Sequence, residues 1–187
     1  GVYWVNMPDF ASSVDNIQVQ RGVGTSSNGA SAFGASINIK TNKVNKKAYG
    51  VIDNSYGSFN TWKNIVKAGT GLINGKFTVD TRLSRISSDG YIDRAESDLK
   101  SYYLSGSWHG KKSLLRATVF SGKEKTYQAW YGTPESIING SQEEITAYAD
   151  RNYISGSDVG NLLTSGRTYN FYTYENEVDN YQQDHYQ

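Results

Sequence analysis

The sequence contains no cysteine, two prolines, one methionine and two histidines. The lack of cysteine excludes disulfides, thiol catalysis and thiolate metal sites together. Lys and Arg number 19 against 18 Asp and Glu, so the charge balance gives no electrostatic case for nucleic-acid binding. No apolar run approaches the roughly 20 residues that a membrane-spanning helix needs. Any membrane would therefore be crossed by strands.

Aromatic residues and glycine are abundant instead. The 187 residues include 15 Tyr, 6 Phe, 4 Trp and 19 Gly. This mixture favours β structure with a girdle of aromatic side chains. The low mean hydropathy does not contradict a membrane location, because a barrel strand turns only alternate side chains to lipid. We therefore expect an all-β fold.

A loop rich in Gly, Ser, Ala and Asn separates two short strands near the start of the chain. Ile17 and Val19 alternate with polar residues before the loop, and Ile37 and Ile39 do so after it. The glycines superficially resemble a phosphate-binding loop, but no Gly-Lys-Ser/Thr and no helical pattern follow them. The sequence therefore predicts a strand, a loop and a returning strand.

The rest of the chain shows further strands joined by turns. Asn74-Gly75 is a strong hairpin signal, and Gly57 opens another tight turn. The predicted strands are Tyr49–Gly57, Trp62–Ala68, Phe77–Ser87, Leu99–Trp108, Leu115–Val119 and Asn180–Gln187. Between 122 and about 179 no alternation is sustained, so we expect a very long loop there.

The segment Phe77–Ser87 has the clearest strand pattern. Its alternating residues form two sets, Phe77, Val79, Thr81 and Leu83 on one face and Thr78, Asp80, Arg82 and Ser84 on the other. The first face tolerates hydrocarbon, and the second needs water or polar partners. In a transmembrane barrel these are the lipid and lumen sides, whereas in a soluble sandwich they are core and solvent.

The first strand pair resembles the end of the plug domain of TonB-dependent outer-membrane receptors. In that family a strand ends in Arg-Gly, a turn reaches an aromatic-Gly pair, and the chain returns through Gly-Gly-x-Ile-Asn-Ile. The matching plug-motif residues here are Arg21, Gly22, Gly29, Gly34 and Asn38. The sequence departs from the family pattern at three positions, with Val23 for Pro, Asn28 for the aromatic residue and Ala35 for the second Gly.

Three later phrases extend the resemblance to iron-chelate receptors of Bacteroidetes-type bacteria. These are YGSFNTWKN at 56–64, SSDGYIDRAESDLKSYY at 87–103 and GKEKTYQAWYGTPES at 122–136. The resemblance implies that 1–42 is the C-terminal part of a plug, which is α+β in the complete protein. Residues 43–187 would then be the first five to six strands of an antiparallel, 22-stranded transmembrane β-barrel with long external loops.

Two features predict that the chain is a fragment of such a receptor. Gly1 begins without a signal peptide, and five or six strands cannot close around a plug. The strands would form an open arc of the barrel. The turns near Gly71 and Gly110 would be periplasmic, and the connections near Gly57, Ser88 and Gly122 would be external.

The function implied by the resemblance is import of a ferric siderophore or another iron chelate across a bacterial outer membrane. Such a protein is a transporter and not an enzyme, with no cofactor and no resident metal. Its partners are the chelate, outer-membrane lipid and TonB, which would contact a segment preceding Gly1. In the family, the arginine at the position of Arg21 pairs with carboxylates of the barrel wall, here expected beyond Gln187. The alternative is a surface arginine at a strand end.

Four residues are candidate ligand contacts. The resemblance places Asn28 where an aromatic residue of the family can face the ligand, which suggests a more polar contact. Tyr127, Trp130 and Tyr131 lie on an expected external loop, and such side chains offer rigid contact area to a chelate or a sugar. The alternative for these three is packing of the long loop or an aromatic belt.

Catalytic and metal chemistry have little support. His109 and His185 have no Ser/His/Asp spacing around them, so we expect surface histidines. Glu143 and Glu144 are adjacent and diverge on any regular element. The loop carboxylates Asp89, Asp93, Glu96 and Asp98 lack the order of a calcium-binding EF-hand, so we expect a solvated loop.

Two alternative functions stay open. The same architecture could import glycans or peptides with a lipoprotein partner. A soluble β-sandwich that binds a ligand by itself is the alternative from another class.

Overall fold

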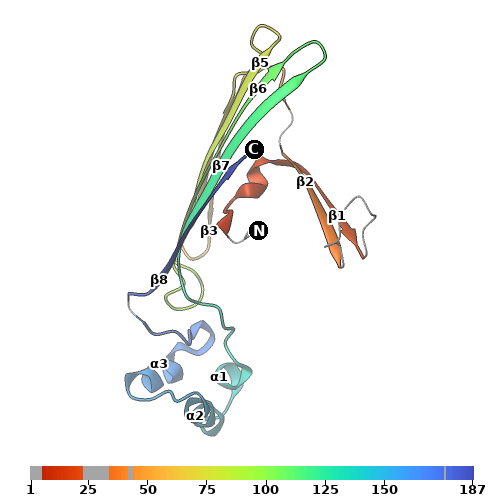
Figure 1. Cartoon of the computed structure of the whole chain (residues 1–187). Coiled ribbons are helices and arrows are strands. Elements are labelled where there is room, and N and C mark those ends of the chain that lie inside the picture. The colour runs from red at the N-terminus through yellow and green to blue at the C-terminus, as the bar shows by residue number, and fades with distance from the viewer. Residues whose placement is uncertain (1–5, 23–33, 42–43, 175) are drawn as a thin grey trace.

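The computed structural model describes residues 6–22, 34–41, 44–174 and 176–187, and its strands form two antiparallel sheets (Figure 1). The first is a hairpin of β1 (Val14–Arg21) and β2 (Ala35–Thr41). The second has six strands, each paired with the next along the chain. These strands are β3 (Tyr49–Gly57), β4 (Thr61–Gly69), β5 (Phe77–Ser88), β6 (Ser97–His109), β7 (Leu114–Tyr127) and β8 (Val178–Tyr186).

The predicted strands are present in the larger sheet, and the turns explain their register. Asn74 and Gly75 have φ of 49° and 67°, a left-handed pair that glycine and asparagine tolerate best. Strand β7 is longer than predicted, because it continues to Tyr127 instead of ending at Val119. Connections 70–76 and 110–113 lie at one end of the sheet, and the remaining connections lie at the other end (Figure 1).

The long segment after β7 is not the plain loop that the sequence predicts. It contains the 3-10 helix η4 (Gly166–Thr168) and three α-helices, α1 (Glu135–Asn139), α2 (Gln142–Arg151) and α3 (Ser157–Ser165). The all-β expectation therefore holds for the sheets and is wrong for this segment. A capping box starts α2, since Ser141 Oγ accepts from Glu144 N at 3.3 Å and Ser141 N donates to Glu144 Oε2 at 2.8 Å.

The helical segment has a small core of its own. Its buried residues are Ile137, Ala149, Leu162 and Tyr169. Burial raises the pKa of Tyr169 to about 12. Figure 1 shows these helices beyond the ends of the strands, away from the faces of the sheet. None of the helices among the described residues is long and apolar enough to span a bilayer.

The six-stranded sheet has a polar face that is covered and an apolar face that is exposed. We call the first the covered face. On β5 and β6 it consists of Thr78, Asp80, Arg82, Ser84, Ser101, Tyr103, Ser105 and Ser107, all at most 9% exposed. We call the second the open face. Its larger side chains are Phe77, Val79, Leu83, Tyr102, Leu104, Trp108 and Leu115, all at least 41% exposed. This is the reverse of a sheet in a water-soluble protein.

The covered face is held by a ladder of hydroxyl groups and by the start of the chain. Thr78 Oγ1 and Ser107 Oγ are 2.5 Å apart, and Ser105 Oγ lies 3.2 Å from Thr118 Oγ1. Residues 6–13, which we call the N-terminal segment, lie against this face and include the 3-10 helix η2 (Phe10–Ser13). In Figure 1 the β1–β2 hairpin stands out from the sheet.

Candidate functional site

The first candidate site is the contact between the N-terminal segment and the covered face, and Asp9 is its centre. Asp9 has φ of 54° and precedes η2. Its carboxylate accepts a hydrogen bond from Ser12 Oγ at 2.5 Å within the segment. This left-handed position suits Asp or Asn, whose short polar side chains bond locally. The turn therefore directs the carboxylate to the sheet.

Three side chains of the sheet surround the Asp9 carboxylate. Lys63 Nζ of β4 lies 2.8 Å from Oδ1, and Arg82 of β5 lies 3.3 Å from Oδ2. Ser84 Oγ donates to Oδ2 at 2.5 Å, and Arg82 also donates to the Asp9 carbonyl. The Asp9 and Arg82 side chains are only 4% and 3% exposed. We call these four residues the Asp9 cluster.

The surroundings of Asp9 hold its carboxyl group ionised. Burial by itself raises the pKa of this carboxyl group, but hydrogen bonds from Lys63, Ser12 and Ser84 outweigh it. The net result is a pKa below the ordinary value. A buried ion pair is costly to form and more costly to leave half-made, so the cluster specifies one docking position for the segment.

The rest of the segment also fits the covered face closely. Lys67 Nζ donates to the Ser12 carbonyl at 2.6 Å. The Phe10 ring lies 5.1 Å from that of Phe120, which stacks on His185 at 4.5 Å. A Cβ at Gly122 would lie 2.4 Å from Pro8 Cδ and 2.6 Å from the Asn6 carbonyl oxygen. The sheet therefore needs glycine at this point.

The predicted plug-motif residues lie elsewhere, in the β1–β2 hairpin. Gly22 has φ of 85°, and its N–H donates to the Gly34 carbonyl at 2.8 Å, which closes the base of the loop. Asn38 pairs with Gln18 in the register and is exposed. Arg21 is exposed at the end of β1, and its pairing with wall carboxylates stays a prediction. Gly29 and Asn28 lie outside the described residues.

The second candidate site is an aromatic cluster on the segment that follows β7. The exposed rings of Trp130 and Tyr131, both predicted ligand contacts, meet Phe171 and Tyr172 from near the end of the same segment. Tyr131 stacks on Tyr172 with ring centroids 5.6 Å apart and an angle of 15°. Tyr127, the third predicted contact, donates its hydroxyl hydrogen to the Tyr174 carbonyl. The sequence pattern did not identify Phe171 or Tyr172.

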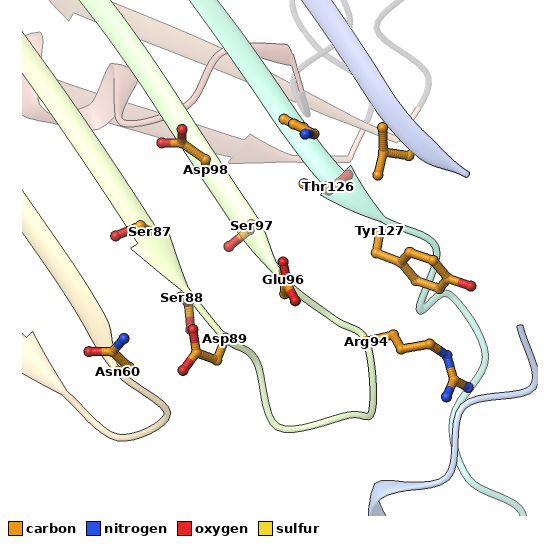
Figure 2. Close-up of a pocket in the computed structure, with 12 residues that line it drawn as sticks. Asn60, Ser87, Ser88, Asp89, Arg94, Glu96, Ser97, Asp98, Thr126 and Tyr127 are labelled. Atoms are coloured by element: carbon orange, nitrogen blue, oxygen red, sulfur yellow. The ribbon is translucent and has the colours of Figure 1, made fainter. Parts of the chain in front are cut away.

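A cavity of about 390 Å³ opens at the same end of the sheet (Figure 2). It is lined by the ends of β5, β6 and β7 and by the loop between β5 and β6. Charged groups of both signs line it, among them Asp89, Arg94, Glu96 and Lys125, together with the ring of Tyr127. Figure 2 shows Arg94 below Tyr127, with its guanidinium directed away from the strands.

Two polar side chains tie this loop to the aromatic cluster. The Arg94 guanidinium donates to the Tyr172 carbonyl at 2.7 and 3.0 Å and to the Asn170 carbonyl at 3.2 Å. Asn170 is 1% exposed and donates to the carbonyls of Asp93 and Gln128 at 2.8 and 3.0 Å. The cavity and the aromatic cluster therefore belong to one assembly of loops.

Three of the four carboxylates predicted to lie on this loop, Asp89, Glu96 and Asp98, line the cavity, and Asp98 belongs to β6. Asp98 pairs with Arg85 and Lys100 at 2.9 and 3.0 Å. In the described part of the chain, no group of three or more His, Cys, Asp or Glu could hold a metal ion. His109 and His185 lie on different strands, near Ser107 and Gln183.

No protein-family model and no curated protein matches the sequence. Among solved structures, the chain is similar to the pyoverdine outer membrane receptor FpvA from Pseudomonas aeruginosa PAO1, solved bound to pyoverdine, with a TM-score of 0.59. The identity is 18%, and the match covers 64% of this chain and 18% of that receptor. The chain thus matches less than a fifth of the receptor's length. At this identity the likeness shows a shared fold alone.

The close approach at Gly122 gives a first prediction. Gly122→Ala should displace residues 6–8, because the new methyl group would overlap Pro8 and the Asn6 carbonyl, at a cost of roughly 1–3 kcal/mol in docking. Amide hydrogen exchange in the N-terminal segment of the native polypeptide should become faster. Gly106→Ala is the control, since a Cβ at Gly106 meets nothing within 4 Å. Equal exchange in the two variants would contradict the close contact.

The Asp9 cluster gives a second prediction. A carboxyl group with a lowered pKa contributes stability above its unfolded pKa and loses it as the pH falls through the folded value. The protection factors of the amides in the N-terminal segment, which are corrected for the pH dependence of the intrinsic exchange rate, should therefore fall below about pH 4. Asp9→Asn keeps a residue that tolerates the left-handed backbone but removes the charge. In this variant the amides of the N-terminal segment should exchange faster already at pH 7, and their protection should not fall further at acid pH. If the variant lost protection at acid pH as the original protein does, a group other than Asp9 would be responsible.

Proposed function

We propose that the chain is part of a TonB-dependent outer-membrane receptor that imports a ferric siderophore or another iron chelate. The observation that carries this proposal is the inverted sheet. Its apolar side chains are exposed, and its buried polar face holds the N-terminal segment. Transmembrane barrels turn apolar side chains to lipid and polar side chains to the interior.

The open face has the side-chain pattern of a lipid-facing wall. Along β5 its apolar band runs from Phe77 to Leu83, and this stretch of six residue steps spans about 20 Å at 3.3 Å per residue. Trp108 and Phe77 pair at one end of the band, and Tyr102 pairs with Leu83 at the other. Aromatic residues at both limits are typical of a membrane barrel. A soluble sandwich would instead cover such a face with a second sheet.

In a complete receptor, the N-terminal segment and the β1–β2 hairpin would lie inside the barrel as the end of the plug. Strands β3 and β8 form the edges of the six-stranded sheet, and in a complete receptor further strands would continue from them. Energised TonB would act on a plug segment that precedes Gly1. The Asp9 cluster supports this assignment, because charged and hydroxyl groups fix the segment to the polar face, with the Phe10–Phe120 contact as a small apolar addition.

The ligand would reach the loop end from outside the cell. The rings of Trp130 and Tyr131 and the charged cavity together offer the apolar surface and polar groups that a small chelate needs. Aromatic rings also stack on sugars, so a glycan importer with a lipoprotein partner is the second candidate. The two candidate functions share the same architecture and differ in the ligand that is imported.

The proposal predicts where the native polypeptide lies and what it transports. Cell fractionation should find the polypeptide carrying residues 14–41 in the outer membrane. Deletion of its gene should lower uptake of at least one radioiron-labelled chelate under iron limitation. Unchanged uptake of every chelate, with a stoichiometric lipoprotein co-purifying, would favour glycan or peptide import instead. Recovery in the soluble fraction without detergent would reject the membrane assignment.

The aromatic cluster predicts a binding defect. The double variant Trp130→Ala/Tyr131→Ala should weaken binding of the transported chelate about tenfold or more, because aromatic anchors dominate many binding surfaces. Tyr153→Asn is the control, since Tyr153 is 93% exposed, has φ of 56° and lies on the same helical segment. Equilibrium binding of the chelate to purified receptor measures the effect. Equal affinities in both variants would leave the cluster a packing role only.

A further inference from the structure

A row of positive side chains lies beside the apolar band of the open face. Arg85 on β5, Lys100 on β6 and Lys123 on β7 are opposite one another in the strand register. Lys125 lies one row nearer the loop end, opposite Asp98. Like charges directly opposite on neighbouring strands repel one another. The row is therefore an arrangement that a bound anion would stabilise.

The acids of the sheet neutralise only part of this charge. Asp98 binds Arg85 and Lys100, whose side chains are still 58% and 56% exposed. The other acid on the open face of β5 to β8 is Asp184, which accepts from Gln182 at 3.3 Å. Within the described residues neither Lys123 nor Lys125 takes part in an ion pair. The four cations thus exceed the two acids on this part of the sheet.

A shallow depression of about 530 Å³ joins the positive row to the apolar band. Val66, Leu83 and Tyr102 line it on the apolar side. The three cations of the row line it on the other side, with Gln182 at its margin. A depression with hydrocarbon on one side and cations on the other matches a ligand with an anionic head and apolar chains.

We propose that this depression binds the phosphate-bearing headgroup of a membrane lipid, with the acyl chains of the lipid along the apolar band. The inference rests on the proposed function, because it requires the open face to meet the bilayer. Neighbouring strands lie about 4.8 Å apart, so one phosphate group reaches cations of two adjacent strands. Charge-assisted bonds from Lys and Arg to phosphate are strong and short. The lipid removes the repulsion within the row and fixes the depth of the sheet in the membrane.

The test uses the full receptor purified in neutral detergent and two lipids that differ only in the phosphate. Native mass spectrometry should detect dioleoyl phosphatidic acid bound to the receptor and little dioleoylglycerol. Lys100→Gln/Lys123→Gln should weaken binding of phosphatidic acid about tenfold or more. The matched control is Lys111→Gln/Lys112→Gln, which removes the same charge in the turn between β6 and β7 and should leave binding unchanged.

Three outcomes would overturn the lipid site. These are equal binding of both lipids, an equal loss in both double variants, and displacement of the lipid by millimolar inorganic phosphate, which would indicate a site for free anions. Fractionation of cells that express the same variants separates this inference from the proposed function. A receptor in the outer membrane that transports its chelate but ignores phosphatidic acid refutes the lipid site only. A receptor outside the membrane refutes the proposed function itself.

Discussion

The strict two-residue period of the large sheet is the constraint on which the rest of the structure depends. Strands β5 and β6 put hydroxyl and charged groups on one side and aromatic and aliphatic groups on the other over most of their length. A shift of the pairing by one residue would exchange the two faces entirely. The polar face then needs hydrogen-bonding partners, which come from neighbouring strands and from the N-terminal segment. The apolar face needs an environment without water.

The Asp9 cluster supplies hydrogen-bonding partners to the polar face through charged groups more than through apolar packing. A segment packed by a large apolar surface would be hard to detach, whereas ion pairs and hydrogen bonds can be replaced by water as they break. The contact with Phe120 adds a small apolar anchor. Such a contact specifies one position for the N-terminal segment and holds it there with modest strength. It would suit the proposed plug, which has to hold its place and still move during transport.

Sequence patterns identify the strands well, because alternation and turn residues are local signals. Phe77–Ser87 and the Asn74-Gly75 turn are examples that the structure contains. Helix α2 is not among the predicted elements, although Ser141 and Glu144 form a capping box, because its helical apolar repeat is a single short one, Ile145, Tyr148 and Ala149. The Asp9 cluster joins residues 54 to 75 positions apart, and Trp130 and Tyr131 meet rings about 40 residues later. No local pattern encodes such contacts.

The helical segment between β7 and β8 begins and ends at neighbouring points, since Tyr127 pairs with Val178. Closing so long a loop costs entropy that grows only with the logarithm of its length, and the sheet already holds both ends together. Its own core of Ile137, Ala149, Leu162 and Tyr169 compensates for ordering it. Insertions, deletions or exchange of this segment would therefore alter the outward surface while leaving strand pairing intact. In the proposed receptor, the ligand-binding surface would thus be free to change while the sheet that carries it stays the same.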